Sequence, residues 1–102
     1  MRMWMVPPRR MCRKHLLGEH VEIHMAVASL RLGRRLDGFL KKGLLELHNL
    51  RVRHDELVAE MRRRGYRHRS PLGAIPRRRG GRVDRRQAAA ELARRCPDCF
   101  RP

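Results

Sequence analysis

The chain has 102 residues, enough for one small domain with a modest core. It carries 26 basic residues against 10 acidic ones, a net charge of +16. This charge favours a polyanion as partner, first of all nucleic acid, although part of the arginine excess can be compositional. No segment predicts a membrane span or a secretory signal peptide, and an odd number of cysteines does not suit a disulfide framework. We therefore expect a cytoplasmic protein.

The first third of the chain predicts an extended segment followed by a long helix. Residues 1–7 are expected to be extended, and Pro8 suits the first turn of a helix. From Arg9 onward apolar residues recur at helical spacing until Gly33, which can end the helix. We therefore expect a first helix over about residues 9–32. Its apolar positions are Met11, Leu16, Val21, Met25, Ala28 and Leu32.

Two more helices and a long loop are expected after it. Asp37 is expected to cap a short helical segment, and a second long helix is expected over residues 44–64. Residues 67–83 contain prolines, glycines and many arginines, which predict a loop or linker. Asp84 begins a last helical stretch that stops before Pro97.

The pattern as a whole predicts an all-α fold. We expect a small compact bundle of about three helices with an extended N-terminal segment and a basic C-terminal tail. Residues 1–70 would form the helical core, and residues 71–102 would complete or flank it. Trp4 and Tyr66 are expected to anchor this core.

Two groups of residues could bind a metal ion. His20 and His24 are one helical turn apart, as two zinc ligands would be, but they match neither helical zinc motif and no third ligand is evident. The sequence CPDC at Cys96–Cys99 is half of a zinc site, which Cys12 or a histidine could complete in space. We favour an interpretation without a metal and keep a small zinc-binding protein as the weakest alternative.

Two stretches, RKHLLGEHVEI and LRVRHDELVAEMRRRGY, resemble the pyrimidine dimer DNA glycosylase family of the phage endonuclease V type. In the first stretch a histidine is followed seven positions later by the family's catalytic glutamate, here His15 and Glu22. The second stretch, residues 50–66, is a similar helix ending in basic residues, a glycine and an aromatic residue. The similarity is free of gaps over residues 1–32 and becomes loose after Ser70.

The resemblance implies a nucleophile that is the α-amino group of the mature N-terminus, here Met1, followed by a DNA-contacting arginine, Arg2. Met1 is expected to be retained, because initiator methionine is generally removed only before small residues. An α-amine with a pKa of about 7.7–8.0 is partly unprotonated near neutral pH and can attack C1′ of a deoxyribose. The resulting imine then allows β-elimination at the 3′ phosphate.

The same resemblance makes Glu22 the second catalytic residue. It would stabilise the cationic sugar and serve in the proton transfers, and nearby positive charge should keep it ionised. His15 and Glu19 would shape the groove around it. No cofactor and no metal are needed for this chemistry.

The chain departs from the family beside the catalytic glutamate, where two arginines of the family are replaced by Val21 and Met25. The aromatic-rich C-terminus of the family is also absent. We therefore expect the lesion that the protein acts on to be either a pyrimidine dimer or an abasic site. We expect a monomer that acts on damaged double-stranded DNA and not at a membrane. The alternative is a non-catalytic basic DNA-binding module. The expected nucleic-acid-binding residues are Arg2, Arg13, Lys14, His15 and Arg31.

Overall fold

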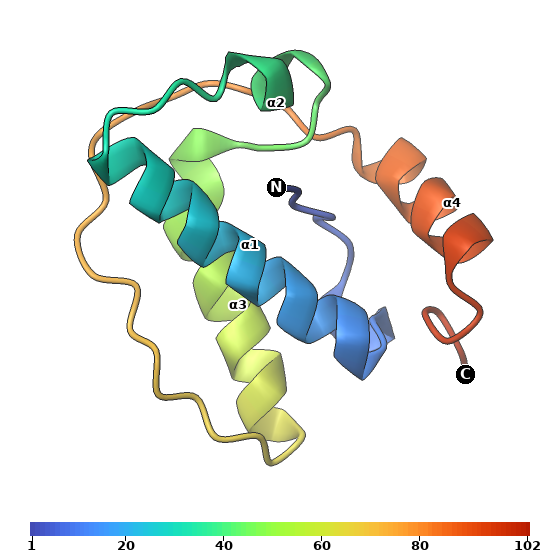
Figure 1. Cartoon of the computed structure of the whole chain (residues 1–102). Helices are drawn as coiled ribbons and strands as arrows, with labels where there is room; N and C mark the ends of the chain where they lie inside the picture. The colour runs from blue at the N-terminus through green and yellow to red at the C-terminus, as the bar shows by residue number, and fades with distance from the viewer.

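The computed structural model describes all residues from 1 to 102 and contains helices but no strand, which confirms the all-α class. None of its helices is both long and apolar enough to span a membrane. Figure 1 shows α1 and α3 packed side by side, with the N-terminal segment between this pair and α4. The elements in chain order are the 3-10 helix η1 (Pro8–Arg10), α1 (Arg13–Arg31), α2 (Asp37–Lys41), the 3-10 helix η2 (Leu47–Asn49), α3 (Leu50–Arg63) and α4 (Arg85–Arg95).

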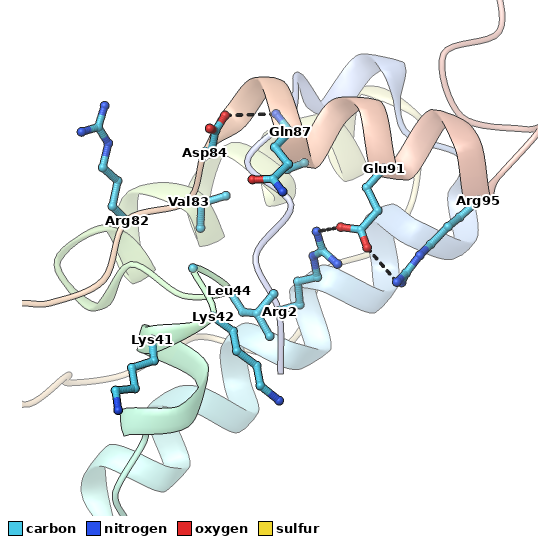
Figure 2. A pocket seen from close by; sticks show the side chains of 12 residues that line it. Arg2, Lys41, Lys42, Leu44, Arg82, Val83, Asp84, Gln87, Glu91 and Arg95 are labelled. Carbon is cyan, nitrogen blue, oxygen red and sulfur yellow. Dashed lines mark hydrogen bonds and ion pairs between the residues drawn. The ribbon is translucent and has the colours of Figure 1, made fainter.

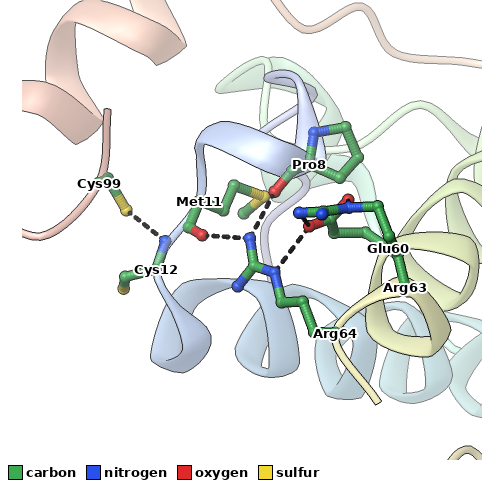
Figure 3. Close-up of polar contacts among 7 residues, drawn as sticks. All are labelled: Pro8, Met11, Cys12, Glu60, Arg63, Arg64 and Cys99. Carbon is green, nitrogen blue, oxygen red and sulfur yellow. Dashed lines mark hydrogen bonds and ion pairs between the residues drawn. The ribbon is translucent and has the colours of Figure 1, made fainter. Parts of the chain in front are cut away.

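Helix α1 begins four residues later than the sequence predicted, because the chain is extended just before it. Met11 (ψ 142°) and Cys12 (ψ 165°) both have extended backbones. Cys12 is the N-cap, and its Sγ accepts a hydrogen bond from the backbone N–H of His15. The Met11 carbonyl accepts instead from the guanidinium of Arg64 at 2.7 Å, as Figure 3 shows. In a continuous helix this carbonyl would accept a hydrogen bond from a backbone N–H of the same helix. Here it accepts instead from an arginine at the end of α3.

Helix α3 begins at Leu50 and not at residue 44, because the residues before it bind another part of the chain. The backbone N–H of Met3 donates to the carbonyl of Leu44 at 2.8 Å, which holds the N-terminal segment against this stretch. Leu45 is fully buried yet lies outside any helix, so its apolar side chain signals burial and not helix. At the other end Gly65 has a φ of 84°, the left-handed conformation that ends helices and favours glycine.

The prediction for residues 67–83 is confirmed, since they contain no regular structure and form an arm around the outside of the helix pair (Figure 1). The guanidinium of Arg31 holds the arm by donating to the carbonyls of Leu72 at 2.8 Å and Ala74 at 2.9 Å. At its far end the backbone N–H of Val83 donates to the buried carboxylate of Glu46 at 2.7 Å. The arm is therefore fixed at both ends.

The prediction for the last helix is confirmed and the prediction for Asp37 is wrong. Asp84 is the N-cap of α4, and its Oδ1 accepts from the backbone N–H of Gln87 at 3.0 Å. Asp37 is the first residue of α2 and not its cap, because its carboxylate accepts from the Arg35 side chain at 2.9 Å.

The hydrophobic core draws on every part of the chain, including α4 and the extended N-terminal segment. Trp4 is buried in it as predicted, whereas Tyr66 is half-buried and packs against its edge. Side chains from the N-terminal segment and from α4 are as deeply buried as those from α1 and α3. The large apolar side chains that are fully buried are Met3, Leu16, Ile23, Leu45, Leu50, Leu57 and Leu92.

A buried ion pair joins α1 to α3 within this core. The guanidinium of Arg53 donates to both carboxylate oxygens of Glu19, at 2.6 and 3.0 Å, and reaches Met11 Sδ at 3.5 Å. Both charged side chains are almost completely shielded from solvent. Glu19 was expected to shape the groove around Glu22, but its carboxylate faces the interior and joins the two long helices.

Replacing Glu19 by alanine is expected to destabilise the fold by about 3–5 kcal/mol, because Arg53 would keep its charge with no buried partner. Urea unfolding measures the change. Glu56→Ala, at an exposed position of α3, is the matched control and should have little effect. The double variant Glu19→Leu with Arg53→Met should recover most of the loss. A Glu19→Ala variant that unfolds like the control would show that the pair is not needed.

Candidate functional site

The N-terminal segment brings the amino group of Met1 to the middle of α1. Residues 1–6 run through the core, where Met3, Trp4 and Val6 are buried. This path leaves the positive amino terminus and the backbone N–H of Arg2 close enough to act on the carboxyl group of Glu22. The two residues proposed from sequence to carry chemistry, Met1 and Glu22, are therefore brought together although 20 residues separate them in the chain.

Burial raises the pKa of Glu22 above its ordinary value, and the neighbouring carboxylate of Glu19 adds to this rise. The amino terminus, the backbone N–H of Arg2 and the Arg2 guanidinium lower the pKa of Glu22 but do not outweigh burial. The positive groups that the sequence predicted near Glu22 are present and lower its pKa. Burial has the larger effect, so the pKa of Glu22 is raised and not lowered as expected. A carboxyl group with a raised pKa takes up and releases a proton more readily near neutral pH.

Arg2 links this site to α4. Its guanidinium lies 3.7 Å from the centre of the Trp4 ring and forms an ion pair with Glu91, which also contacts Arg95 at 2.7 Å. Figure 2 shows Arg2, Glu91 and Arg95 lining an open cleft between α2, α4 and the N-terminal segment. The volume of this cleft is about 510 Å³. Basic groups outnumber acidic ones along the cleft. Its charged lining residues are Arg2, Lys41, Lys42, Arg82, Asp84, Glu91 and Arg95.

The other residues expected to contact nucleic acid lie in different settings. Lys14 is exposed, and Arg13 is exposed with its guanidinium 4.8 Å from the centre of the Tyr66 ring. The Arg31 guanidinium is already bound to backbone carbonyls of the arm. The ring of His15 packs edge-on against Trp4, and its Nδ1 lies among thiols and not toward open solvent.

The two residues that replace the family's arginines lie on the surface of α1. Val21 is 54% exposed and Met25 is 51% exposed, one helical turn apart and on either side of Glu22 in sequence. The surface beside the candidate catalytic carboxyl group is thus apolar where the family has two cations.

Cysteine and histidine side chains gather in two further clusters. In each cluster the potential ligand atoms of four residues lie within 4.8 Å of one another. From sequence, Cys12 or a histidine was named as the partner that could complete the CPDC pair, and the structure places Cys12 and His15 there. The partners of His20 and His24 on other elements were not recognised. His48 is the one histidine outside both clusters. The first cluster is Cys12, His15, Cys96 and Cys99, and the second is His20, His24, His54 and His68.

The histidine cluster favours neutral imidazoles. Burial, together with charge repulsion from the neighbouring rings of His24, His54 and His68, lowers the pKa of His20 to about 4. Burial likewise lowers the pKa of His24 and of His68. Near neutral pH these rings therefore keep a free nitrogen lone pair.

A family model described as pyrimidine dimer DNA glycosylase matches residues 1–73 of the chain. This range includes Met1, Arg2 and Glu22 and ends before the CPDC sequence. No curated protein and no solved structure matches the chain.

Proposed function

Because the chain belongs to the pyrimidine dimer DNA glycosylase family, we propose that it excises damaged bases with the Met1 amine as nucleophile and then cleaves the strand as an AP lyase. A role as a DNA glycosylase in repair follows from the family, and damaged DNA is its substrate. The finer proposal is carried by one observation, the convergence of the Met1 amino group and the Glu22 carboxyl group.

In the proposed reaction the unprotonated amine attacks C1′ of the damaged nucleotide. The new N–C1′ bond replaces the glycosidic bond, and the base leaves with the electron pair of that bond and takes up a proton. The sugar ring opens to an imine, which acidifies the C2′ proton. Loss of that proton expels the 3′ phosphate by β-elimination, and hydrolysis of the imine releases the amine.

Glu22 would act twice in this sequence. As a carboxylate beside C1′ it stabilises the positive charge that develops on the sugar as the base departs. It then accepts and returns protons during ring opening and elimination, and a raised pKa suits this role because it brings the protonation of the carboxyl group closer to neutral pH.

The basic cleft lined by Arg2 would hold the phosphate backbone of a DNA duplex beside the reacting nucleotide. Its cations offer salt-dependent contacts that carry no sequence information. Arg13 and Lys14 are exposed at the start of α1 and would add further contacts. The apolar surface at Val21 and Met25 would face sugars or bases where phosphate contacts are lacking. We propose that one chain suffices for this binding.

The first prediction is that borohydride traps a covalent adduct between the untagged protein and duplex DNA that carries one abasic site. Reduction fixes the imine, and peptide mass spectrometry should map the adduct to the Met1 amine. Protein acetylated at Met1 should give no adduct, while protein with a short C-terminal extension and a free Met1 should still give one. Salt-sensitive binding without any adduct would instead support the non-catalytic binding module.

The second prediction concerns Glu22→Gln, which should lower turnover roughly 100-fold or more while duplex binding persists. Glu56→Gln on the exposed side of α3 is the matched control and should keep full activity.

The same Glu22→Gln variant also tests the raised pKa. Since the folded state favours protonated Glu22, the wild type should lose stability as pH rises through that raised pKa, and the variant should lack this loss. Thermal unfolding between about pH 4 and pH 7 measures the difference. A variant that matches the wild type in turnover would remove Glu22 from the mechanism.

A further inference from the structure

We propose that Cys12, His15, Cys96 and Cys99 bind a zinc ion that fastens the C-terminal tail to the start of α1. The four ligands come in two pairs with the same spacing, Cys12 with His15 at the N-terminus of α1 and Cys96 with Cys99 after α4. This site is independent of the proposed glycosylase chemistry.

Two of the three contact distances within the cluster are those of a tetrahedral zinc site, and the Cys12–His15 distance is slightly shorter. Cys12 Sγ lies 3.8 Å from Cys96 Sγ and 3.2 Å from His15 Nδ1, and Cys99 Sγ lies 3.6 Å from His15 Nδ1. Zinc bonds of about 2.3 Å to sulfur and about 2.0–2.1 Å to nitrogen require ligand atoms about 3.5–3.8 Å apart. A disulfide would need sulfurs about 2.05 Å apart, and all three cysteines are free.

Each sulfur also receives the backbone hydrogen bonds that stabilise a thiolate. The N–H of Cys12 donates to Cys99 Sγ at 3.3 Å (Figure 3), and the N–H of His15 donates to Cys12 Sγ at 3.5 Å. The N–H groups of Asp98 and Cys99 donate to the sulfur of Cys96. Such outer contacts orient metal ligands and hold negative charge on sulfur.

Charge and ligand number point to a structural ion. Three thiolates and one neutral imidazole bring a zinc ion to a local charge of −1, which suits a chain of net charge +16. Four protein ligands leave no open position for a substrate, so the ion would not take part in catalysis. Its effect would be to add a cross-link to a chain whose single core is small. His15 would then be a metal ligand and not a DNA contact.

A different observation supports a second metal site in the histidine cluster. His20 and His24 on α1, His54 on α3 and His68 on the arm turn ring nitrogens toward one point, and the Nε2 atoms of His20 and His68 are 3.0 Å apart. The Nε2 atoms of His24 and His54 are buried with no hydrogen-bond partner, which is costly unless something binds them.

Three of the four rings also contact a further polar group, as metal-bound imidazoles do. His54 Nδ1 lies 3.0 Å from the Asp55 carboxylate, and the backbone of Ser70 hydrogen-bonds to His24 and His68. Four imidazoles suit zinc and related divalent transition metals. The ion would join the arm to both long helices. Because four neutral ligands leave its charge of +2 uncompensated, we infer weaker binding here than at the thiolate site.

The test of the thiolate site is metal analysis of untagged protein, followed by loading of metal-free protein with Co²⁺. We expect at least one tightly held zinc per chain and, with Co²⁺, a sulfur-to-cobalt charge-transfer band in the near ultraviolet. Cys99→Ser should weaken this band strongly, and His48→Ala should leave it unchanged. Wild-type protein with neither stoichiometric zinc nor the cobalt band would overturn the proposal, whether or not the variants fold.

The histidine site predicts a second zinc per chain, lost first when a chelator is added. His24→Ala should bind one zinc fewer than the wild type and keep the sulfur–cobalt band, whereas His48→Ala should keep both ions. X-ray absorption at the zinc edge of the two-zinc protein should show more nitrogen than sulfur neighbours on average. A wild type that saturates at one zinc with mainly sulfur neighbours would overturn this second site and leave the first intact.

Discussion

The buried ion pair between Glu19 and Arg53 determines how α1 is rotated about its own axis. A helix turns about 100° per residue, so once Glu19 faces α3 every other side chain of α1 has its direction set. Glu22, three residues on, then lies beside the N-terminal segment. His20 and His24 fall on the other flank, where α3 supplies His54 and the arm supplies His68. With Glu19 facing α3, the proposed catalytic residue Glu22 lies on one flank of α1 and the histidines lie on the opposite flank.

Polar contacts also hold two non-helical parts of the chain, the N-terminal segment and the arm, against the helices. The N-terminal segment is joined to α4 through Arg2 and Glu91, and the arm is held at its two ends by Arg31 and Glu46. Several of the numerous arginines are therefore bound to carboxylates or backbone carbonyls of the same chain. Net charge alone would overstate how many of them face a nucleic acid, and the exposed Arg13 and Lys14 differ from Arg31 in this respect.

The helices were predictable from sequence, and the family resemblance pointed to Met1 and Glu22 together. The starting points of the helices were not predictable, and the two clusters were predictable only in part, since Cys12 or a histidine was named as a partner of the CPDC pair. Apolar spacing reports burial, and residues 45–47 are buried although they lie outside any α-helix, so the start of α3 was placed too early. The start of α1 depends on Arg64 binding the Met11 carbonyl from more than 50 residues away. The CPDC pair and the two histidines of α1 were visible, but their partners depend on the packing of α4, α3 and the arm. His68 in particular lies in a loop whose path no periodicity could indicate.

The course of the N-terminal segment has a consequence for how the protein folds. Its first residues contact Leu44 and Glu91, so the surroundings of Met1 are built from both halves of the chain. Contacts between residues this far apart in sequence require large loops to close, which slows folding relative to a bundle of locally paired helices. Helices α1 and α3 lie within residues 13–63, whereas the Met1 environment includes α4 as well. Conformations that have regained their helices can therefore still lack the assembled surroundings of Met1 and Glu22, and recovery of helical signal during refolding will run ahead of recovery of function.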